Sequence, residues 1–270
     1  MLPWKKATLA ALAALFLILV SEGRAAAVDV NLEQAIRNSR FIFAGTFETL
    51  SASNLSLLAP SEQTALVRVR TVVEQPPVFG PVQGALVTVQ LESTAGAVEG
   101  GQAVFFTNGM LYGEHLAVSE VARIPDQPGI PESAILDPLR SDVTAVRQME
   151  ADEALSARLA SAVAVVSGRV GETRTLGRSD EAGEHSATWI FAGLAVDSTL
   201  KGRPAAGVYF AEDADEFWAE SPKLTPGQQG IFLLQHPVDG DVPPDALVVV
   251  NALDVLSIDQ LDRVRGLLFR

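Results

Sequence analysis

The amino-acid sequence predicts a mainly β protein with flanking helices, arranged as two tandem five-stranded β-barrels. The first observation is a repeated strand: AVAVVSGRVGET (residues 162–173) resembles RFIFAGTFETL (residues 40–50), about one domain length upstream. The second is that four further β-rich runs follow each of these strands in the same order. The third is a proline-rich segment, residues 125–140, which indicates a semi-stiff linker between the two halves.

Each half reads as five strands separated by turn residues, and this order repeated twice indicates an internal repeat. Gly45 aligns with Gly168, and we expect both where a bulge or a close backbone approach leaves no room for a Cβ atom. The expected strands of the first half are residues 41–47, 64–74, 85–92, 98–108 and 115–124. Their counterparts in the second half are residues 164–170, 186–196, 207–213, 224–236 and 246–256.

Helices are expected at both ends of the repeat and between its halves. Asn31 and Gln34 resemble a capped helix start, and Ser257 and Gln260 form a clearer capping box before the last helix. Residues 141–162 lack glycine and proline and carry apolar residues at helical spacing, so we expect one long or broken helix there. The predicted organisation is a signal peptide at 1–27, a first barrel at 28–124, the linker at 125–140 and a second barrel at 141–270.

The distribution of apolar residues on the strands favours a small closed sheet. Val67, Val69 and Val73 share one face of their strand, opposite Arg68, which suits a strand that is wet on one side. Residues 41–44 are apolar on both faces, so the first strand should be covered on both sides. A five-stranded, partly open barrel with a helix packed across it satisfies both observations, and that architecture is the OB-fold.

The N-terminus has the features of an export signal. Lys5 and Lys6 precede an uninterrupted apolar run at residues 7–20, and Ala25 and Ala27 fit an A-x-A cleavage site. The run is shorter than the roughly 20 residues that a membrane-spanning helix needs, so cleavage is favoured over a retained anchor. The sequence therefore predicts a secreted or periplasmic protein.

Composition argues against several classes of function. Removing residues 1–27 takes away three of the 20 basic and one of the 33 acidic residues, which leaves a formal net charge of −15. That charge disfavours nucleic acid and anionic membranes as partners, because both are bound mainly through Lys and Arg. The chain has no cysteine, which excludes thiol catalysis, iron–sulfur clusters and cysteine zinc sites. Nucleotide-binding glycine loops are also missing, so we expect no cofactor.

The chain resembles the netrin-module and tissue-inhibitor-of-metalloproteinases superfamily of OB-folds, in the cysteine-free form of bacterial secreted proteins. The resemblance is carried by VAVVSGRV (163–170), AVDSTLKGRP (195–204) and LTPGQQGIFLLQ (224–235), with echoes in FIFAGTF (41–47), VVEQPPVFGP (72–81) and VEGGQAVFFT (98–107). It implies recognition of a protein or glycan at the cell envelope. Inhibitors of this superfamily place an N-terminal cysteine on a protease zinc, and this chain has no cysteine to do so.

The densest acidic segment, residues 212–218, supplies the candidate site residues. It joins the third and fourth strands of the second half, and its aromatic residues are of the type enriched at protein interfaces. The partner-contact candidates are Asp213, Asp215, Glu216, Phe217 and Trp218. A plain solvated loop is the alternative, and a calcium site is disfavoured because the glycine that turns such a loop is missing. We therefore expect no metal.

Ser198 and Lys201 match the S-x-x-K signature of serine acyltransferases. That chemistry needs the serine at a helix start with the lysine one turn later, whereas here the match lies at a strand end and glycine and proline follow. A strand-to-turn transition explains these residues better than catalysis does.

The sequence thus favours an exported, non-enzymatic binding or scaffolding protein. An inhibitor of extracellular hydrolases that does not use cysteine zinc chelation is one alternative. An enzyme of unrecognised type, using the acidic segment or scattered histidines, is another.

Overall fold

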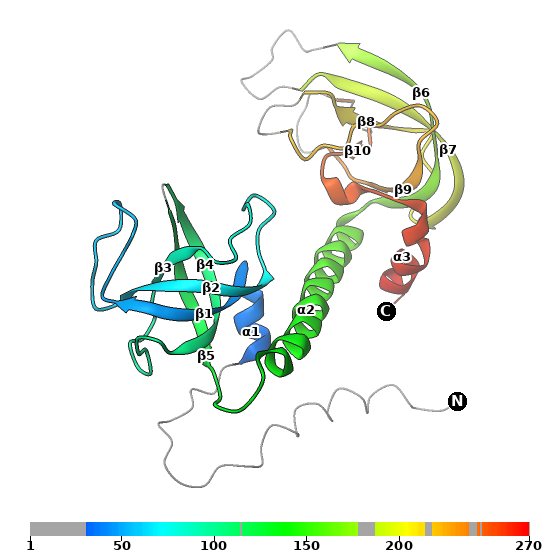
Figure 1. Ribbon diagram of the computed structural model, residues 1–270. Helices are drawn as coiled ribbons and strands as arrows, with labels where there is room; N and C mark the ends of the chain where they lie inside the picture. Colours follow the sequence, from blue (N-terminus) through cyan, green and yellow to red (C-terminus); the bar gives the residue numbers. More distant parts are fainter. Residues whose placement is uncertain are drawn as a thin grey trace, which may run out of the picture. The chain divides into compact units, whose positions relative to one another are not determined.

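The computed structural model describes residues 31–113, 115–177, 187–213, 218–237, 242–243 and 245–269. The chain divides into two compact units, residues 1–136 and 137–270 (Figure 1). Both units are built mainly of strands, with few helices, as predicted. Among the described residues, no helix has the length and apolar character that crossing a membrane requires.

The first unit is a closed barrel of five strands. Helix α1 (Leu32–Arg37) precedes the strands, which are β1 (Phe41–Leu50), β2 (Thr64–Glu74), β3 (Leu86–Gln90), β4 (Gln102–Tyr112) and β5 (Leu116–Pro125). They close in the order β1-β2-β3-β5-β4, and β4 pairs with β1. Neighbouring strands are antiparallel except β3 and β5, which run parallel.

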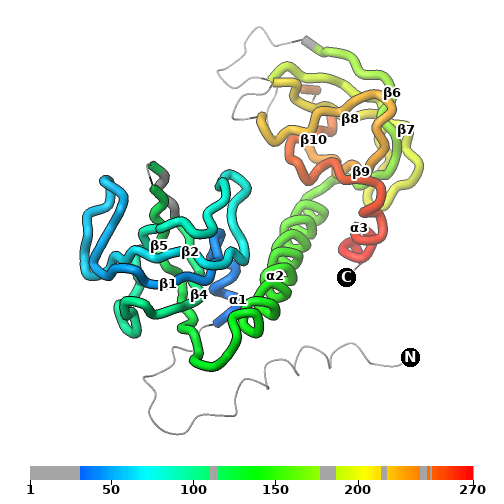
Figure 2. Tube along the Cα trace, viewed as in Figure 1, coloured from blue at the N-terminus to red at the C-terminus, as the bar shows by residue number. Residues whose placement is uncertain are grey.

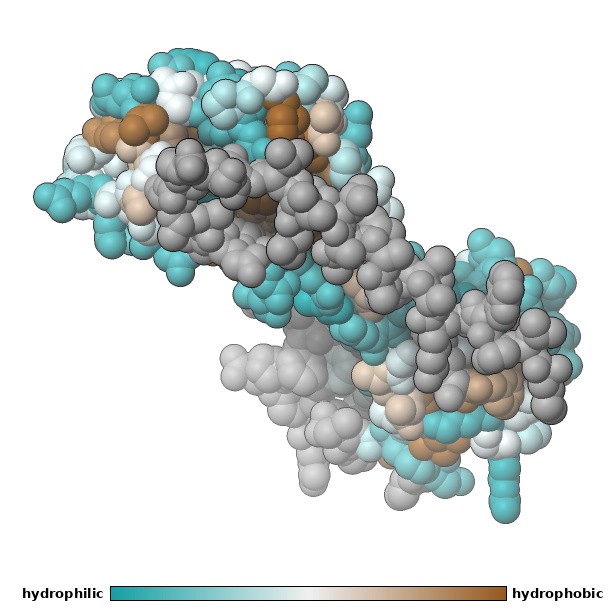
Figure 3. Space-filling view, turned by 90° about the horizontal axis from the view of Figure 1, so that it is seen from below, coloured by the Kyte–Doolittle hydropathy of each residue, from teal (hydrophilic) through white to brown (hydrophobic). Residues whose placement is uncertain are grey.

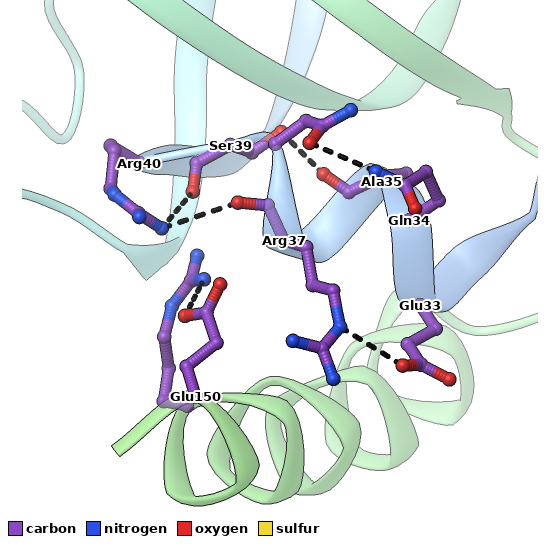
Figure 4. A network of polar contacts seen from close by, with 9 residues as sticks. Glu33, Gln34, Ala35, Arg37, Ser39, Arg40 and Glu150 are labelled. Atoms are coloured by element: carbon purple, nitrogen blue, oxygen red, sulfur yellow. Dashed lines mark hydrogen bonds and ion pairs between the residues drawn. The ribbon is translucent and has the colours of Figure 1, made fainter. Parts of the chain in front are cut away.

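Helix α1 begins and ends with local polar contacts. The Asn31 side chain accepts a hydrogen bond from the backbone N–H of Gln34, which confirms the predicted capped start. Arg37 pairs with Glu33 one turn earlier at 3.0 Å. The buried Ser39 hydroxyl donates to the Ala35 carbonyl at 2.7 Å, and Figure 4 shows this contact together with the Arg37–Glu33 pair. The helix is therefore closed off before β1 starts.

Aromatic side chains fill the interior of the first barrel. Phe43 stacks on Phe105 with ring centroids 5.2 Å apart, Phe47 meets Phe105 edge-on at 5.2 Å, and Phe41 stacks on Phe43 at 4.5 Å. The four residues 41–44 have no exposed surface, which confirms that β1 is covered on both faces. Such offset and edge-on pairs add to the energy gained by burying the rings.

Gly45 and Gly168 occupy the same position in the two units. In each unit the ladder between the first two strands shifts register immediately before the glycine. A Cβ atom at Gly168 would lie 2.4 Å from the Ala195 carbonyl oxygen, and one at Gly45 would lie 2.5 Å from a Val67 methyl carbon. Both glycines are therefore bulge positions without room for a side chain, as predicted.

The second unit is a six-stranded sheet in the order β10-β8-β7-β6-β9-β11. Its strands are β6 (Ala164–Gly177), β7 (Trp189–Lys201), β8 (Gly207–Ala211), β9 (Gln229–Leu234), β10 (Val248–Val249) and β11 (Val255–Leu256). The remaining elements are helix α2 (Glu132–Ser161), the short 3-10 helices η1 (Ala252–Asp254) and η2 (Ile258–Gln260), and helix α3 (Leu261–Leu268). Figure 2 shows β6 and β7, the longest strands of the unit, running side by side.

The predicted fifth strand of the second unit is split, so the unit is not the simple closed barrel expected. β10 runs parallel to β8, β11 runs antiparallel to β9, and η1 separates them. Asp254 causes the break, because its buried carboxylate accepts the N–H groups of Val250 and Asn251 and folds the chain into a turn. Among the described residues, a single bridge between Gln235 and Val248 joins the end of β9 to β10.

Helix α2 begins earlier than predicted. Strand β5 ends at Pro125, the first residue of the predicted linker 125–140. The linker is irregular only up to Pro131, and residues 132–140 already belong to α2. Prolines before a helix leave its hydrogen bonds intact, whereas Pro138 removes one bond inside it. Further along, the predicted helix at 141–162 is confirmed to Ser161.

Candidate functional site

The structure describes only part of the acidic segment that the sequence singled out. Asp213 accepts a short hydrogen bond from the backbone N–H of Thr188. Lys223 donates to the carbonyls of Ala211 and Asp213 at 2.6 and 2.7 Å. Asp215, Glu216 and Phe217 lie outside the described residues. The start of the segment is thus fixed to the end of β8, and the partner-contact role of the segment stays a prediction.

Trp218 belongs to a core cluster on the outer face of the second sheet. Its ring meets Trp189 edge-on with centroids 5.3 Å apart, and both side chains are buried. The cluster also contains Ala187, Ala211, Val242, Ala246 and Val248. In this structure Trp218 therefore fixes the acidic segment to the sheet through its apolar ring.

Strands β7 and β8 carry apolar residues on both faces, so the sheet has two packed sides. Ile190 and Phe210 point into the main core of the unit, whereas Trp189 and Tyr209 belong to the outer side. This alternation follows from the two-residue period of a strand. The outer face next to the tryptophan cluster carries a hollow.

The hollow has a volume of about 640 Å³ and lies against the outer face of β7 and β8. Its aromatic residues are Phe191 and Tyr209, whose rings meet edge-on at 5.2 Å. Two connections form its sides, the segment 202–206 between β7 and β8 and residues 243 and 245–247 before β10. The hollow is therefore assembled from parts of the second unit that lie up to about 80 residues apart in the sequence.

A stack of three groups fixes the position of Phe191. The Arg174 guanidinium lies 4.8 Å from the centroid of the Phe191 ring, a cation–π contact. On the neighbouring strand, a Cβ atom at Gly207 would lie 2.3 Å from the same ring. Phe191 thus covers a glycine in the adjacent strand, which explains why the third strand of this unit begins with glycine.

The rim of the hollow is polar, in contrast to its apolar floor. Its polar residues are the exposed Arg203 and Asp245, which lie beside the exposed Pro204 and Pro243. An apolar surface with a few polar groups at the edge is the usual composition of a ligand site. The arrangement can bind an apolar ring or side chain and position it with one cationic and one anionic group.

A second hollow, of about 420 Å³, is lined by residues of β6, β7, β8 and the segment before β9. Its polar residues include Arg174, Glu212 and Lys223. Lys223 is already used in the two carbonyl contacts described above, and Arg174 stacks on Phe191. Both cations of this hollow are therefore already engaged in contacts within the protein.

The S-x-x-K match does not bring its two side chains together. The hydroxyls of Ser198 and Ser167 are 2.8 Å apart. Lys201 donates to the carbonyls of Leu159 and Ala160 at 2.8 Å each. Lys201 therefore closes the C-terminal end of α2, where unpaired carbonyls and the helix dipole favour a cation. The match has a structural explanation, as the sequence indicated.

Two charged residues that the sequence reading did not single out lie inside the first barrel. Glu120 and Arg123 on β5 form an ion pair at 3.1 Å, with side chains only 5% and 7% exposed. Their signal in the sequence is two opposite charges in the last expected strand of the first half, at a spacing that a regular strand would place on opposite faces.

Among the described residues, no group of three histidine, aspartate or glutamate side chains is placed to hold a metal ion. Comparison with protein-family models and with curated protein sequences found no match. The fold and the geometry of the hollow are therefore the basis for a functional proposal.

Proposed function

We propose that this chain is an exported, non-enzymatic binding protein that recognises a protein or glycan at the cell envelope. The observation that carries the proposal is the 640 Å³ hollow on the outer face of β7 and β8, with an aromatic floor and a charged rim. Export is supported by the signal-like features of residues 1–27, and by the acidic composition that keeps a protein soluble outside the cell.

We further propose that both units are OB-like modules that arose by duplication. In support, the two bulge glycines correspond, and the third strand of each unit pairs in parallel with the start of the fifth. OB-folds bind ligands on the face of strands two and three and on the adjoining loops. In the second unit these strands are β7 and β8, and residues 243 and 245–247 lie in the connection between strands four and five. The hollow occupies that location.

The chemistry of the hollow suits a ligand with both apolar and polar surface. Tyr209 offers an aromatic ring and a hydroxyl, and such side chains supply large contact area at low entropic cost. Arg203 and Asp245 at the rim can fix the orientation of a sugar or a peptide by hydrogen bonds. Outside the grey residues, the face seen in Figure 3 is mostly hydrophilic with scattered apolar groups.

The alternatives remain predictions with less support. Within the described part of the chain, we find no convergent set of nucleophile, base and oxyanion donors that would favour an enzyme. The hypothesis of a hydrolase inhibitor rests on the superfamily resemblance alone.

The proposal is tested by binding of the purified mature protein to an immobilised envelope extract of the producing cells. Tyr209→Ala and the double variant Arg203→Ala, Asp245→Ala should each weaken binding about tenfold or more, as removal of central contacts does. Arg265→Ala on α3 is the matched control, because its side chain is about half exposed and lies outside the hollow. Protease and glycosidase treatment of the extract separates a protein ligand from a glycan. No binding by the wild type, or equal binding by all variants, would contradict the proposal.

A further inference from the structure

A buried ion pair lies inside the first barrel, away from the hollow. Glu120 pairs with Thr107 on β4, and Arg123 pairs with Phe105, whose ring is in the barrel core. The register shifts between these pairs, so Val121 is an extra residue on β5. This bulge places Glu120 and Arg123 on the same face, which a regular strand would not do at this spacing.

The pair connects an exposed turn to the core of the barrel. Arg123 donates to the carbonyls of Ser93 and Ala95, at 3.1 and 2.8 Å, in the connection between β3 and β4. Residues 92–96 are exposed, whereas the two side chains beneath them are almost fully buried. We call residues 92–97 the covering turn.

The other side of Arg123 faces an aromatic ring. Its guanidinium lies 5.3 Å from the centroid of Phe47, which belongs to the aromatic core of the barrel. Ala97, at the end of the covering turn, packs against the same core. Moving the turn away would therefore expose both the ion pair and one end of the apolar interior.

Burial controls the titration of Glu120. Loss of solvation raises the pKa of Glu120 from 4.5 to about 7, although the nearby Arg123 cation lowers it. The Glu92 carboxylate also raises this pKa, whereas its backbone hydrogen bond lowers it. Arg123 and Glu92 are the charged groups that face Glu120, from β5 itself and from the covering turn, while β4 presents the uncharged Thr107.

We propose that Glu120 and Arg123 form a proton-dependent latch, which holds the covering turn over the barrel at acidic pH and releases it above neutral pH. The direction follows from linkage: a carboxylate that is harder to ionise when covered than when solvated binds its proton more tightly in the covered state. Acid therefore favours the covered state, and ionisation of Glu120 favours release. This latch is independent of the proposed binding site, because it lies in the other unit.

Hydrogen–deuterium exchange of the full mature chain tests the latch. After correction for intrinsic exchange rates, amides of the covering turn should be protected at pH 5.5 and exchange about tenfold or more faster at pH 8. We expect a change of about tenfold or more because each unit of difference in the Glu120 pKa between the covered and released states changes the ratio of these states tenfold. Glu120→Gln removes the titrating group, so its turn should stay protected at both pH values. Glu48→Gln, a half-exposed carboxylate of the same barrel, should behave as the wild type.

Equal corrected protection of the wild type at both pH values would overturn the proposal, as would an unchanged pH dependence in Glu120→Gln. If Glu120→Gln fails to fold, carbon-13 carboxyl NMR of the wild type decides instead. A Glu120 titration midpoint near 7 supports the latch, and a midpoint near 4.5 overturns it.

Discussion

At the scale of single residues, the two bulge glycines differ in what a side chain would meet. At Gly168 the obstacle is the Ala195 carbonyl, which is backbone, whereas at Gly45 it is a Val67 methyl group. Backbone yields less easily than a side chain, so we expect Gly168→Ala to cost about 1–3 kcal/mol of unfolding free energy and Gly45→Ala less.

Denaturant unfolding followed by circular dichroism measures this difference. Gly266→Ala is the control, since a Cβ atom there meets nothing within 4 Å and alanine favours the helix. Its unfolding free energy should stay the same or rise slightly. A Gly168→Ala variant as stable as the wild type would show that the bulge does not need glycine.

Glu120 also gives the first unit a defined pH dependence of stability. The pKa of Glu120 is raised in the folded state from 4.5 to about 7. Its contribution to the free energy of unfolding is therefore fully present below pH 4.5 and is lost as the pH rises through 7. The wild type should therefore lose stability relative to Glu120→Gln between pH 5 and pH 8. Thermal unfolding of both proteins at these two pH values checks the sign, and a gain in relative stability with rising pH would contradict it.

At the scale of elements, the break in the fifth strand of the second unit depends on one carboxylate. Asp254 is fully buried, accepts two backbone N–H groups and binds Arg158 of α2 through both oxygens, at 2.5 and 2.6 Å. Removing one partner of a buried ion pair leaves the other charge unpaired, which costs about 3–5 kcal/mol.

We therefore expect Asp254→Ala to lower the unfolding free energy of the second unit by roughly that amount. Asp262→Ala, whose carboxylate is 98% exposed on α3, should leave it unchanged. Urea titration of both variants makes the comparison. If Asp254→Ala were as stable as the wild type, the carboxylate would not be what holds the turn between β10 and β11.

Most elements whose pattern is local could be predicted from the sequence. The bulge at Gly168, the capped start of α1 and the regular part of α2 follow from spacing and turn chemistry. The predicted capping box of Ser257 and Gln260 is wrong, because the Ser257 side chain makes no capping hydrogen bond and residues 258–260 form the 3-10 helix η2.

The break at η1 was missed although its Asn251–Asp254 capping box is local, because the cation that pairs with the buried Asp254 carboxylate, Arg158, is 96 positions away in the sequence. The early start of α2 was missed because prolines that precede a helix were read together with Pro138 inside it.

The site was harder to predict than the fold. The sequence pointed to the acidic segment, and Trp218 in it turns out to pack against Trp189. Phe191, Tyr209 and the rim residue Asp245 lie on β7, on β8 and in the segment before β10, so they line one hollow only when these strands are assembled in the sheet. The available signal was an aromatic residue on the strand next to Gly207, whose ring covers that glycine. Strands that are apolar on both faces do not indicate which face is accessible to a ligand.

At the scale of the whole molecule, the account requires export and processing. The protein should be recovered from the periplasm or the medium with Val28 at or near its N-terminus, because Ala25 and Ala27 form the predicted cleavage site. N-terminal sequencing and intact mass of the exported protein test this. Recovery only from the cytoplasm, with the apolar run intact, would contradict the predicted localisation.

The proposed function depends on recognition of a partner through the outer face of β7 and β8. Site-directed photo-crosslinking tests it most directly, with a photoreactive amino acid placed at position 203 beside the hollow or at position 265 on α3 in the full chain. The account predicts one defined adduct with an envelope component from position 203, lost when Tyr209 is replaced by alanine, and none from position 265. Equal labelling from both positions, or an adduct that survives the Tyr209→Ala change, would contradict it.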